Sequence, residues 1–210
     1  MLNKQGFDLW ANEYDETVKV SEESNLYPFA GYKEILNTIF NEVMQKEQSK
    51  VLDIGFGTGV LTNKLYENAH LIDGVDFSAE MIAITQAKMP SANLIEWDIE
   101  NGLPDEIVAN RYDSIVSTYA LHHLTDEAKI IFIQNLFSLL AAGGKIFIGD
   151  IAFETRMKLE LCRSDSAGYW DEDEFYFVAD EISSALSDVC RCEFYPISHC
   201  GGVFVITRLA

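Results

Sequence analysis

Short apolar runs alternate with longer amphipathic segments along most of the chain. Five of these runs are β-branched or aromatic and are bounded by Gly, Asp or Pro, as is typical of strands. They are KVLDIG (50–55), LIDGVD (71–76), NLIEWD (93–98), YDSIVSTY (112–119) and GKIFIGDI (144–151). Strands that alternate with helices in this way indicate a parallel sheet with helices on both of its faces.

Two of the intervening segments carry the pattern and the end signals of helices. In residues 126–140, four apolar side chains fall on one helical face: Ile133, Leu136, Phe137 and Leu140. Thr125 is placed to cap this helix and Gly143 to end it. Ser78 is likewise placed to cap a helix over 79–89, which Pro90 stops.

The end of the chain has a different pattern. CRCEFYPIS (190–198) and VFVITR (203–208) are two strand-like runs with only HCGG between them. So short a link permits a hairpin and excludes a parallel crossover. The pattern therefore predicts an α/β fold of the Rossmann-like, doubly wound type, with a seven-stranded, mostly parallel sheet that ends in an antiparallel C-terminal hairpin.

The length of 210 residues suits a single domain, and the charge of the chain limits which partners it can bind. Thirty-four acidic residues against 15 basic ones give a net charge of −19. Because phosphate backbones and anionic membrane surfaces are bound through lysine and arginine patches, we expect neither nucleic acid nor a membrane surface as a partner.

Targeting and redox signals are absent from the sequence. No stretch approaches the roughly 18 apolar residues of a membrane helix, and the first residues, MLNKQGFDLWANEYDE, show no apolar signal-peptide region. We therefore expect a cytoplasmic protein. The four cysteines, Cys162, Cys190, Cys192 and Cys200, form no CxxC pair, so we expect reduced thiols and no metal site.

A glycine-rich turn follows the first predicted strand. In VLDIGFGTG (51–59), Gly55 and Gly57 come directly after the strand and precede a helix, which is where open α/β sheets bind ligands. The dinucleotide pattern G-x-G-x-x-G/A does not fit, because its third small residue would be Val60 or Thr62. A tight structural turn explains the glycines about as well as a ligand does.

Three acidic residues favour a ligand at this turn. Asp53 lies inside a buried strand, where a carboxylate is costly unless it is paired, and a ligand cation would satisfy it. Asp76 ends the next strand, at the place and spacing that suit a grip on ribose hydroxyls. Asp98 ends the third strand. A helix cap could explain Asp76 or Asp98 singly, but it does not explain Asp53.

In order and spacing, residues 50–150 resemble the class I S-adenosylmethionine-dependent methyltransferases. The similarity is carried by VLDIGFGTG (51–59), VDFSAEMI (75–82), EWDIE (96–100), YDSIVSTYALHHLTD (112–126) and LLAAGGKIFIGD (139–150). Within the family the chain is most similar to small, stand-alone bacterial enzymes that methylate small molecules. The resemblance implies an N-terminal lid or helical segment (1–45), a cofactor-binding core (50–150) and a part with acceptor-side helices and the hairpin (151–210).

The resemblance also implies roles for the residues of the turn. Asp53, with the backbone of Gly55, Phe56 and Gly57, would hold the methionine part of S-adenosyl-L-methionine. Asp76 would hold the ribose hydroxyls.

Further roles concern the adenine and the methionine amine. Phe77 and Met81 would pack on the adenine, and Asp98 would accept a hydrogen bond from its amino group. Ile99 would add an apolar contact, and the backbone carbonyl of Thr118 would lie near the methionine amine.

The candidates for catalysis and for a lid lie outside these motifs. His122 and His123 follow the fourth strand, and a general base is needed only if the acceptor must lose a proton; local packing of both rings is the alternative. Trp10 and Tyr14, in a segment that resembles the family's lid, are four residues apart and so share a helical face. They either cover the cofactor or anchor an N-terminal helix.

Three functions stay open at this point. The first is methyl transfer to a small-molecule acceptor. The second is S-adenosylmethionine binding without catalysis, since binding and turnover share residues. The third, an NAD-dependent Rossmann enzyme, is disfavoured by Asp53 and by the missing third glycine. The sequence does not distinguish a monomer from a homodimer.

Overall fold

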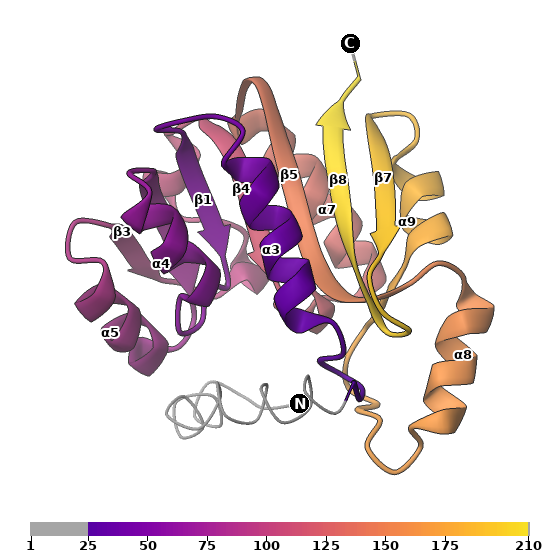
Figure 1. The fold of residues 1–210 in the computed structure, drawn as a ribbon. Coiled ribbons are helices and arrows are strands. Elements are labelled where there is room, and N and C mark those ends of the chain that lie inside the picture. Colours follow the sequence, from indigo (N-terminus) through magenta and orange to yellow (C-terminus); the bar gives the residue numbers. More distant parts are fainter. Residues whose placement is uncertain (1–24, 210) are drawn as a thin grey trace.

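A central sheet organises the computed structural model, which describes residues 25–209 (Figure 1). Seven strands are hydrogen-bonded in the order β3-β2-β1-β4-β5-β8-β7, and a short eighth strand, β6, pairs with β5. The strands are β1 (Lys50–Ile54), β2 (Leu71–Asp76), β3 (Asn93–Glu96), β4 (Tyr112–Thr118), β5 (Leu140–Phe153), β6 (Phe177–Val178), β7 (Cys190–Pro196) and β8 (Gly201–Arg208). The predicted seven-stranded sheet is confirmed, with the two-residue β6 as an addition.

The strand order places a crevice at the middle of the sheet. From β1 the chain winds outward through β2 and β3, then returns to β4 on the other side of β1. All pairings from β3 to β5 are parallel. Ligands of open α/β sheets bind at the carboxyl ends of the strands where the order reverses, here β1 and β4.

Helices cover both faces of the sheet, as predicted. The helices are α3 (Tyr32–Val43), α4 (Val60–Glu67), α5 (Ala79–Lys88), α6 (Asp105–Val108), α7 (Asp126–Leu136), α8 (Arg156–Asp165) and α9 (Ala179–Leu186), with 3-10 turns η1 (Ile99–Asn101), η2 (Leu121–His123) and η3 (Phe137–Leu139). Helices α3 and α4 pack one apolar core against the front of the sheet in Figure 1, and α7 and α9 pack a second core behind it.

The predicted helix caps form, but one predicted helix end is wrong. Ser78 Oγ accepts a 3.2 Å hydrogen bond from the Met81 N–H, and Thr125 Oγ1 accepts one of 3.2 Å from Ala128. Helix α7 ends at Leu136 and continues as η3, so Gly143 does not terminate it. Gly143 instead lies inside β5 at φ 74°, where the pairing with β4 shifts register. A glycine with positive φ serves a β-bulge as well as a helix end.

The C-terminal hairpin is confirmed. β7 and β8 are antiparallel, with Cys190 opposite Arg208 and Pro196 opposite Gly202. β8 in turn runs antiparallel to β5. All four cysteines are free thiols. Among residues 25–209, no helix has the length and apolar character needed to span a membrane.

Candidate functional site

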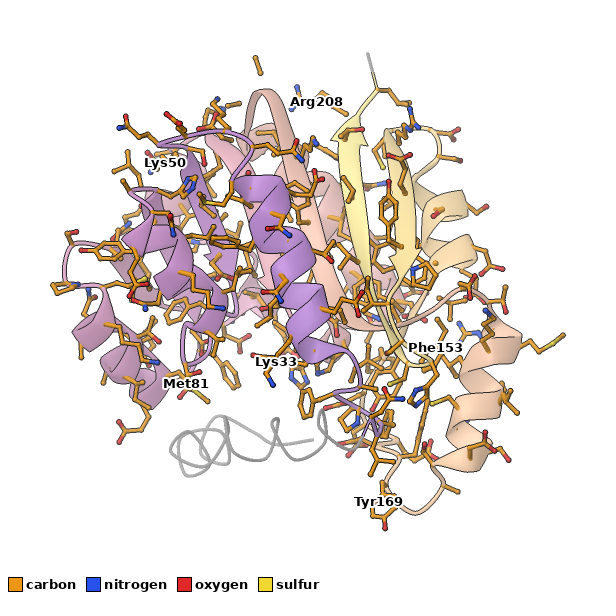
Figure 2. The ribbon with its side chains drawn as sticks, viewed as in Figure 1. Lys33, Lys50, Met81, Phe153, Tyr169 and Arg208 are labelled. Carbon is orange, nitrogen blue, oxygen red and sulfur yellow. The ribbon has the colours of Figure 1, made fainter. Side chains whose placement is uncertain are left out.

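A cavity of about 340 Å³ lies at the carboxyl edge of β1, β2 and β4. Its wall includes ten of the residues predicted to bind the cofactor, together with one of the two histidines: Asp53, Gly55, Phe56, Gly57, Asp76, Phe77, Met81, Asp98, Ile99, Thr118 and His123. Figure 2 shows Met81 at this edge of the sheet and Lys50, the first residue of β1, at the opposite edge. Tyr14 and Trp10 lie outside the described residues.

The glycine turn after β1 forms one wall of the cavity. Gly55 has φ +71°, and a Cβ there would lie 2.3 Å from the Cβ of Ala120, so this position has no room for a side chain. Gly57 has φ +53°, and a Cβ there would meet no atom within 4 Å. The side of Gly57 on which a Cβ would stand therefore faces open space, where a ligand can come close to the Cα.

Asp76 joins the end of β2 to the glycine turn. Its Oδ2 accepts a 2.8 Å hydrogen bond from the backbone N–H of Gly57, and its Oδ1 accepts one of 2.9 Å from Ser78. The side chain is 5% exposed. These two bonds orient the carboxylate group, which forms part of the cavity wall.

Asp53 is a buried carboxyl group that the protein satisfies only in part. Its Oδ2 accepts a hydrogen bond from the hydroxyl of Thr62 in α4. Its Oδ1 is buried and has no hydrogen-bond partner among residues 25–209. Burial, reinforced by the charge of Asp76, raises the pKa of Asp53 to about 7, against the lowering effect of the Thr62 bond. A cation at this end of the cavity would satisfy the carboxylate.

The far end of the cavity is more apolar. Phe77 and Met81 line it from the start of α5, and Ile99 lines it from η1. Asp98 caps η1, where its Oδ1 accepts a 3.0 Å hydrogen bond from the Glu100 N–H. Apolar walls beside a carboxylate suit a flat aromatic group that carries a hydrogen-bond donor.

The structure separates the two histidines. His123 lines the cavity, whereas His122 does not. His122 Nδ1 lies 2.6 Å from Oδ1 of the buried Asp150. Burial alone would lower the pKa of His122, but the carboxylates of Asp150 and Glu174 outweigh burial and raise it. Burial and the charge of His122 lower the pKa of His123 to about 3.

Several residues of the cavity wall were not predicted. Trp97 adds an aromatic wall beside Ile99, and its indole N–H donates a 3.1 Å hydrogen bond to the carbonyl of Gly102. Tyr32 and Tyr119 add two rings whose centroids are 5.2 Å apart. Trp97 and Tyr119 lie inside the motifs quoted above, so their positions next to Asp98 and Thr118 were the available signal. Tyr32 lies on α3, outside these motifs, and no sequence pattern indicated that it would reach the cavity.

Comparison with known proteins finds methyltransferases that are similar to this chain in sequence. A family model described as a methyltransferase domain matches residues 51–144. An uncharacterized methyltransferase of Anoxybacillus flavithermus is 39% identical over 168 residues, which cover 79% of this chain and 76% of the relative. One of Alkaliphilus oremlandii is 36% identical over 186 residues, which cover 85% of this chain and 84% of the relative.

Solved structures resemble the fold at much lower identity. The structure of a DhpI–SAH complex superposes with a TM-score of 0.69 at 18% identity and covers 98% of this chain and 94% of the other. Magnesium protoporphyrin IX methyltransferase from Synechocystis PCC 6803 with bound SAH superposes with a TM-score of 0.67 at 17% identity, covering 86% of this chain and 85% of the other. Both likenesses support the Rossmann-like architecture.

Proposed function

Since the chain belongs to the class I S-adenosylmethionine-dependent methyltransferases, we propose that it methylates a small-molecule acceptor and that the cavity at the carboxyl edge of the sheet binds the cofactor. The observation that carries the site assignment is the buried Asp53, whose Oδ1 has no partner among residues 25–209. S-adenosylmethionine supplies an electrophilic methyl group on a positively charged sulfur and also carries an ammonium group. An acidic wall suits that cation and would repel a pyrophosphate.

The glycine turn and Asp53 fit the methionine part of the cofactor. Gly57 has open space where a Cβ would stand, and Gly55, Phe56 and Gly57 all line the cavity. We assign the ammonium group of the cofactor to the side of the cavity that Asp53 and Thr118 line. Asp53 lies on β1 and Thr118 ends the adjacent strand β4, so the two residues come from neighbouring strands.

The other predicted contacts fit the nucleoside part. Asp76 is oriented by Gly57 and Ser78 and lines the cavity, where a carboxylate suits the hydrogen-bond donors of two ribose hydroxyls. Phe77, Met81 and Ile99 offer apolar faces for the adenine, and Asp98 offers an acceptor for its amino group. We add Trp97 to this set, since it lines the same end.

We attribute most of the acceleration of methyl transfer to the positioning of the acceptor relative to the methyl group. Methyl transfer is an in-line displacement, so holding the acceptor atom in line with the methyl group supplies much of the acceleration. The general-base role of His123 or His122 stays a prediction. His123 is the histidine that reaches the cavity, but with a pKa of about 3 it would hold an abstracted proton weakly at neutral pH.

The net charge of −19 supports a small-molecule acceptor rather than nucleic acid. A cytoplasmic location, the exclusion of nucleic-acid partners, and a monomeric or homodimeric state stay predictions. Binding of the cofactor without catalysis is the alternative function. An NAD-dependent reaction is less favoured, because the turn lacks the third small residue and carries Asp53.

Labelled S-adenosylmethionine tests the proposal. The full chain is incubated with the methyl-labelled cofactor and with separate small-molecule, RNA and protein fractions of a bacterial extract. We expect label in a small-molecule fraction only. Label in RNA or protein would overturn the acceptor class, and calorimetric binding of S-adenosylhomocysteine without label in any fraction would favour the non-catalytic alternative.

A further inference from the structure

Three potential metal ligands meet beside the cavity, outside the predicted cofactor contacts. His122 and His123 come from η2, and Glu174 comes from the segment that leads into β6. One ligand atom from each lies within 4.8 Å of the other two. Glu174 Oε1 is 3.6 Å from His122 Nε2 and 3.9 Å from His123 Nδ1. We propose that His122, His123 and Glu174 form a binding site for a divalent transition-metal ion of the zinc type.

The spacing suits such an ion. Zinc binds nitrogen and oxygen ligands at about 2.0–2.2 Å in a tetrahedral arrangement, which places neighbouring ligand atoms roughly 3.3 Å apart. The two separations that involve Glu174 exceed this value by only a few tenths of an ångström. The two histidine nitrogens lie within 4.8 Å of each other, so rotation of the histidine rings as well as of Glu174 is needed to bring the three ligand atoms around one ion. Two imidazoles and a carboxylate are also the ligand types that zinc and related ions prefer.

Two of the three ligands, His122 and Glu174, are each oriented by a hydrogen bond to another side chain. Nδ1 of His122 is engaged by the buried Asp150 at 2.6 Å, which leaves Nε2 to face Glu174. Glu174 Oε2 accepts a 2.8 Å hydrogen bond from the hydroxyl of Tyr176, which leaves Oε1 to face the histidines. Metal-binding histidines and carboxylates are characteristically oriented by a second partner in this way.

The backbone also fixes the distance between the two segments. The N–H of Phe175, next to Glu174, donates a 2.8 Å hydrogen bond to the carbonyl of His122. The ammonium of Lys129 donates to the carbonyl of Phe175. These two hydrogen bonds hold the segment around Glu174 next to the segment around His122. The three ligands are therefore already close together, and no loop has to move to bring them together.

Three protein ligands would leave one position of a tetrahedral ion for water or another ligand. The described residues supply three protein ligands, which is the number found in zinc sites that keep a position for water or substrate. His123 lines the cavity while His122 and Glu174 stand behind it. The ion would thus lie at the cavity wall. This site departs from the expectation, drawn from cysteine spacing, that the chain binds no metal.

Zinc titration of the full chain tests the site without any acceptor. After treatment with a chelator, the protein is titrated with Zn²⁺ by calorimetry at a pH near 7.5. We expect one ion per chain with micromolar or tighter affinity, and a loss of at least about 10²-fold in His123→Gln and in Glu174→Gln. Asp150→Asn, which disturbs the orientation of His122, should cost about 10–100-fold.

Matched variants and a second ion make the result decisive. His199→Gln and Glu47→Gln change an exposed histidine and an exposed glutamate that are not among the three ligands, and should leave the affinity unchanged. Co²⁺ reports the ligand type, because cysteine ligation gives an intense sulfur-to-cobalt band that a histidine–carboxylate site lacks. Circular dichroism checks that each variant is folded.

The alternative is that Asp150 and Glu174 only orient the His122 ring and that no ion binds there. Absence of stoichiometric zinc binding, equal affinity in the ligand variants and the wild type, or a sulfur-to-cobalt band would each overturn the metal site in favour of that arrangement. Because S-adenosylhomocysteine binding is measured in the same samples, failure of the metal site is distinguishable from failure of the proposed function.

Discussion

The backbone N–H of Gly57 donates a 2.8 Å hydrogen bond to Oδ2 of Asp76 and so ties the turn after β1 to the end of β2. One carboxylate thus shapes the glycine turn and faces the cavity. A change at Asp76 is expected to act on both the turn and the ligand.

Asp76→Ala tests the ribose contact. We expect the affinity for S-adenosylhomocysteine to fall by about 2–3 kcal/mol, because two charge-assisted hydrogen bonds are lost. Calorimetry measures the change, with Asp188→Ala as a control at an exposed carboxylate away from the cavity. Unchanged affinity in a folded Asp76→Ala protein would remove this residue from the binding site.

The buried Asp53 predicts a pH-dependent stability of the ligand-free protein. Its pKa is raised from 3.8 to about 7, chiefly by burial, so the folded state favours the protonated form. Its contribution to the free energy of unfolding is therefore fully present below pH 3.8 and is lost as the pH rises through about 7. Urea denaturation of the wild type and of Asp53→Asn should differ in slope between these pH values, with the loss confined to the wild type.

An exposed carboxyl group serves as the control for this comparison. Asp105→Asn, at the start of α6, should keep the slope of the wild type. Parallel curves for the wild type and Asp53→Asn across the whole range would contradict the raised pKa.

The two glycines predict different consequences of adding a methyl group. Gly55→Ala should lower the free energy of unfolding by about 2–4 kcal/mol, because left-handed strain adds to the clash with Ala120. Gly57→Ala should cost only about 1–2 kcal/mol in stability, since only the strain remains, but should weaken cofactor binding. Denaturant unfolding and calorimetry separate the two effects. Equal stability losses would show that Gly57 is as closely packed as Gly55.

Chelation separates the two roles considered for the histidines. Given an acceptor, His123→Ala should lower turnover with little change in cofactor affinity; loss of a general base typically costs about 10²–10⁴-fold. If His123 acts as a base, a chelator should leave the wild-type turnover unchanged. The proposed metal site instead predicts that chelation lowers it and that added Zn²⁺ restores it. A steady-state assay with and without a chelator decides between them.

The sequence predicted the parts of this structure that local chemistry determines. Ser78 and Thr125 cap their helices because their hydroxyls accept from the nearby backbone, and such signals are local. Gly143 was assigned wrongly because a positive φ has the same sequence signature in a helix end and in a bulge. The convergence of Asp53, Asp76 and Asp98 on one cavity followed from the parallel strand order.

The remaining part of the site depends on tertiary contacts. Glu174 lies far along the chain from His122, and no local pattern indicates that the Phe175 N–H bonds to the His122 carbonyl. Similarly, Tyr32 reaches the cavity because α3 packs against the sheet. The sequence around Tyr32 has only the pattern of an ordinary amphipathic helix. Which of two adjacent histidines faces the cavity also depends on the turn η2, not on residue type.

The direction of β8 has a practical consequence for experiments on this protein. Because β8 is antiparallel to β5, it leads away from the edge where the cavity lies, and Figure 2 shows Arg208 at the opposite edge of the sheet. The seven steps between the eight residues of Gly201–Arg208, at about 3.3 Å each, carry the chain roughly 23 Å from that edge. A fluorophore, affinity handle or sensor surface attached after Leu209 would therefore leave the cavity accessible, so binding can be followed on immobilised protein.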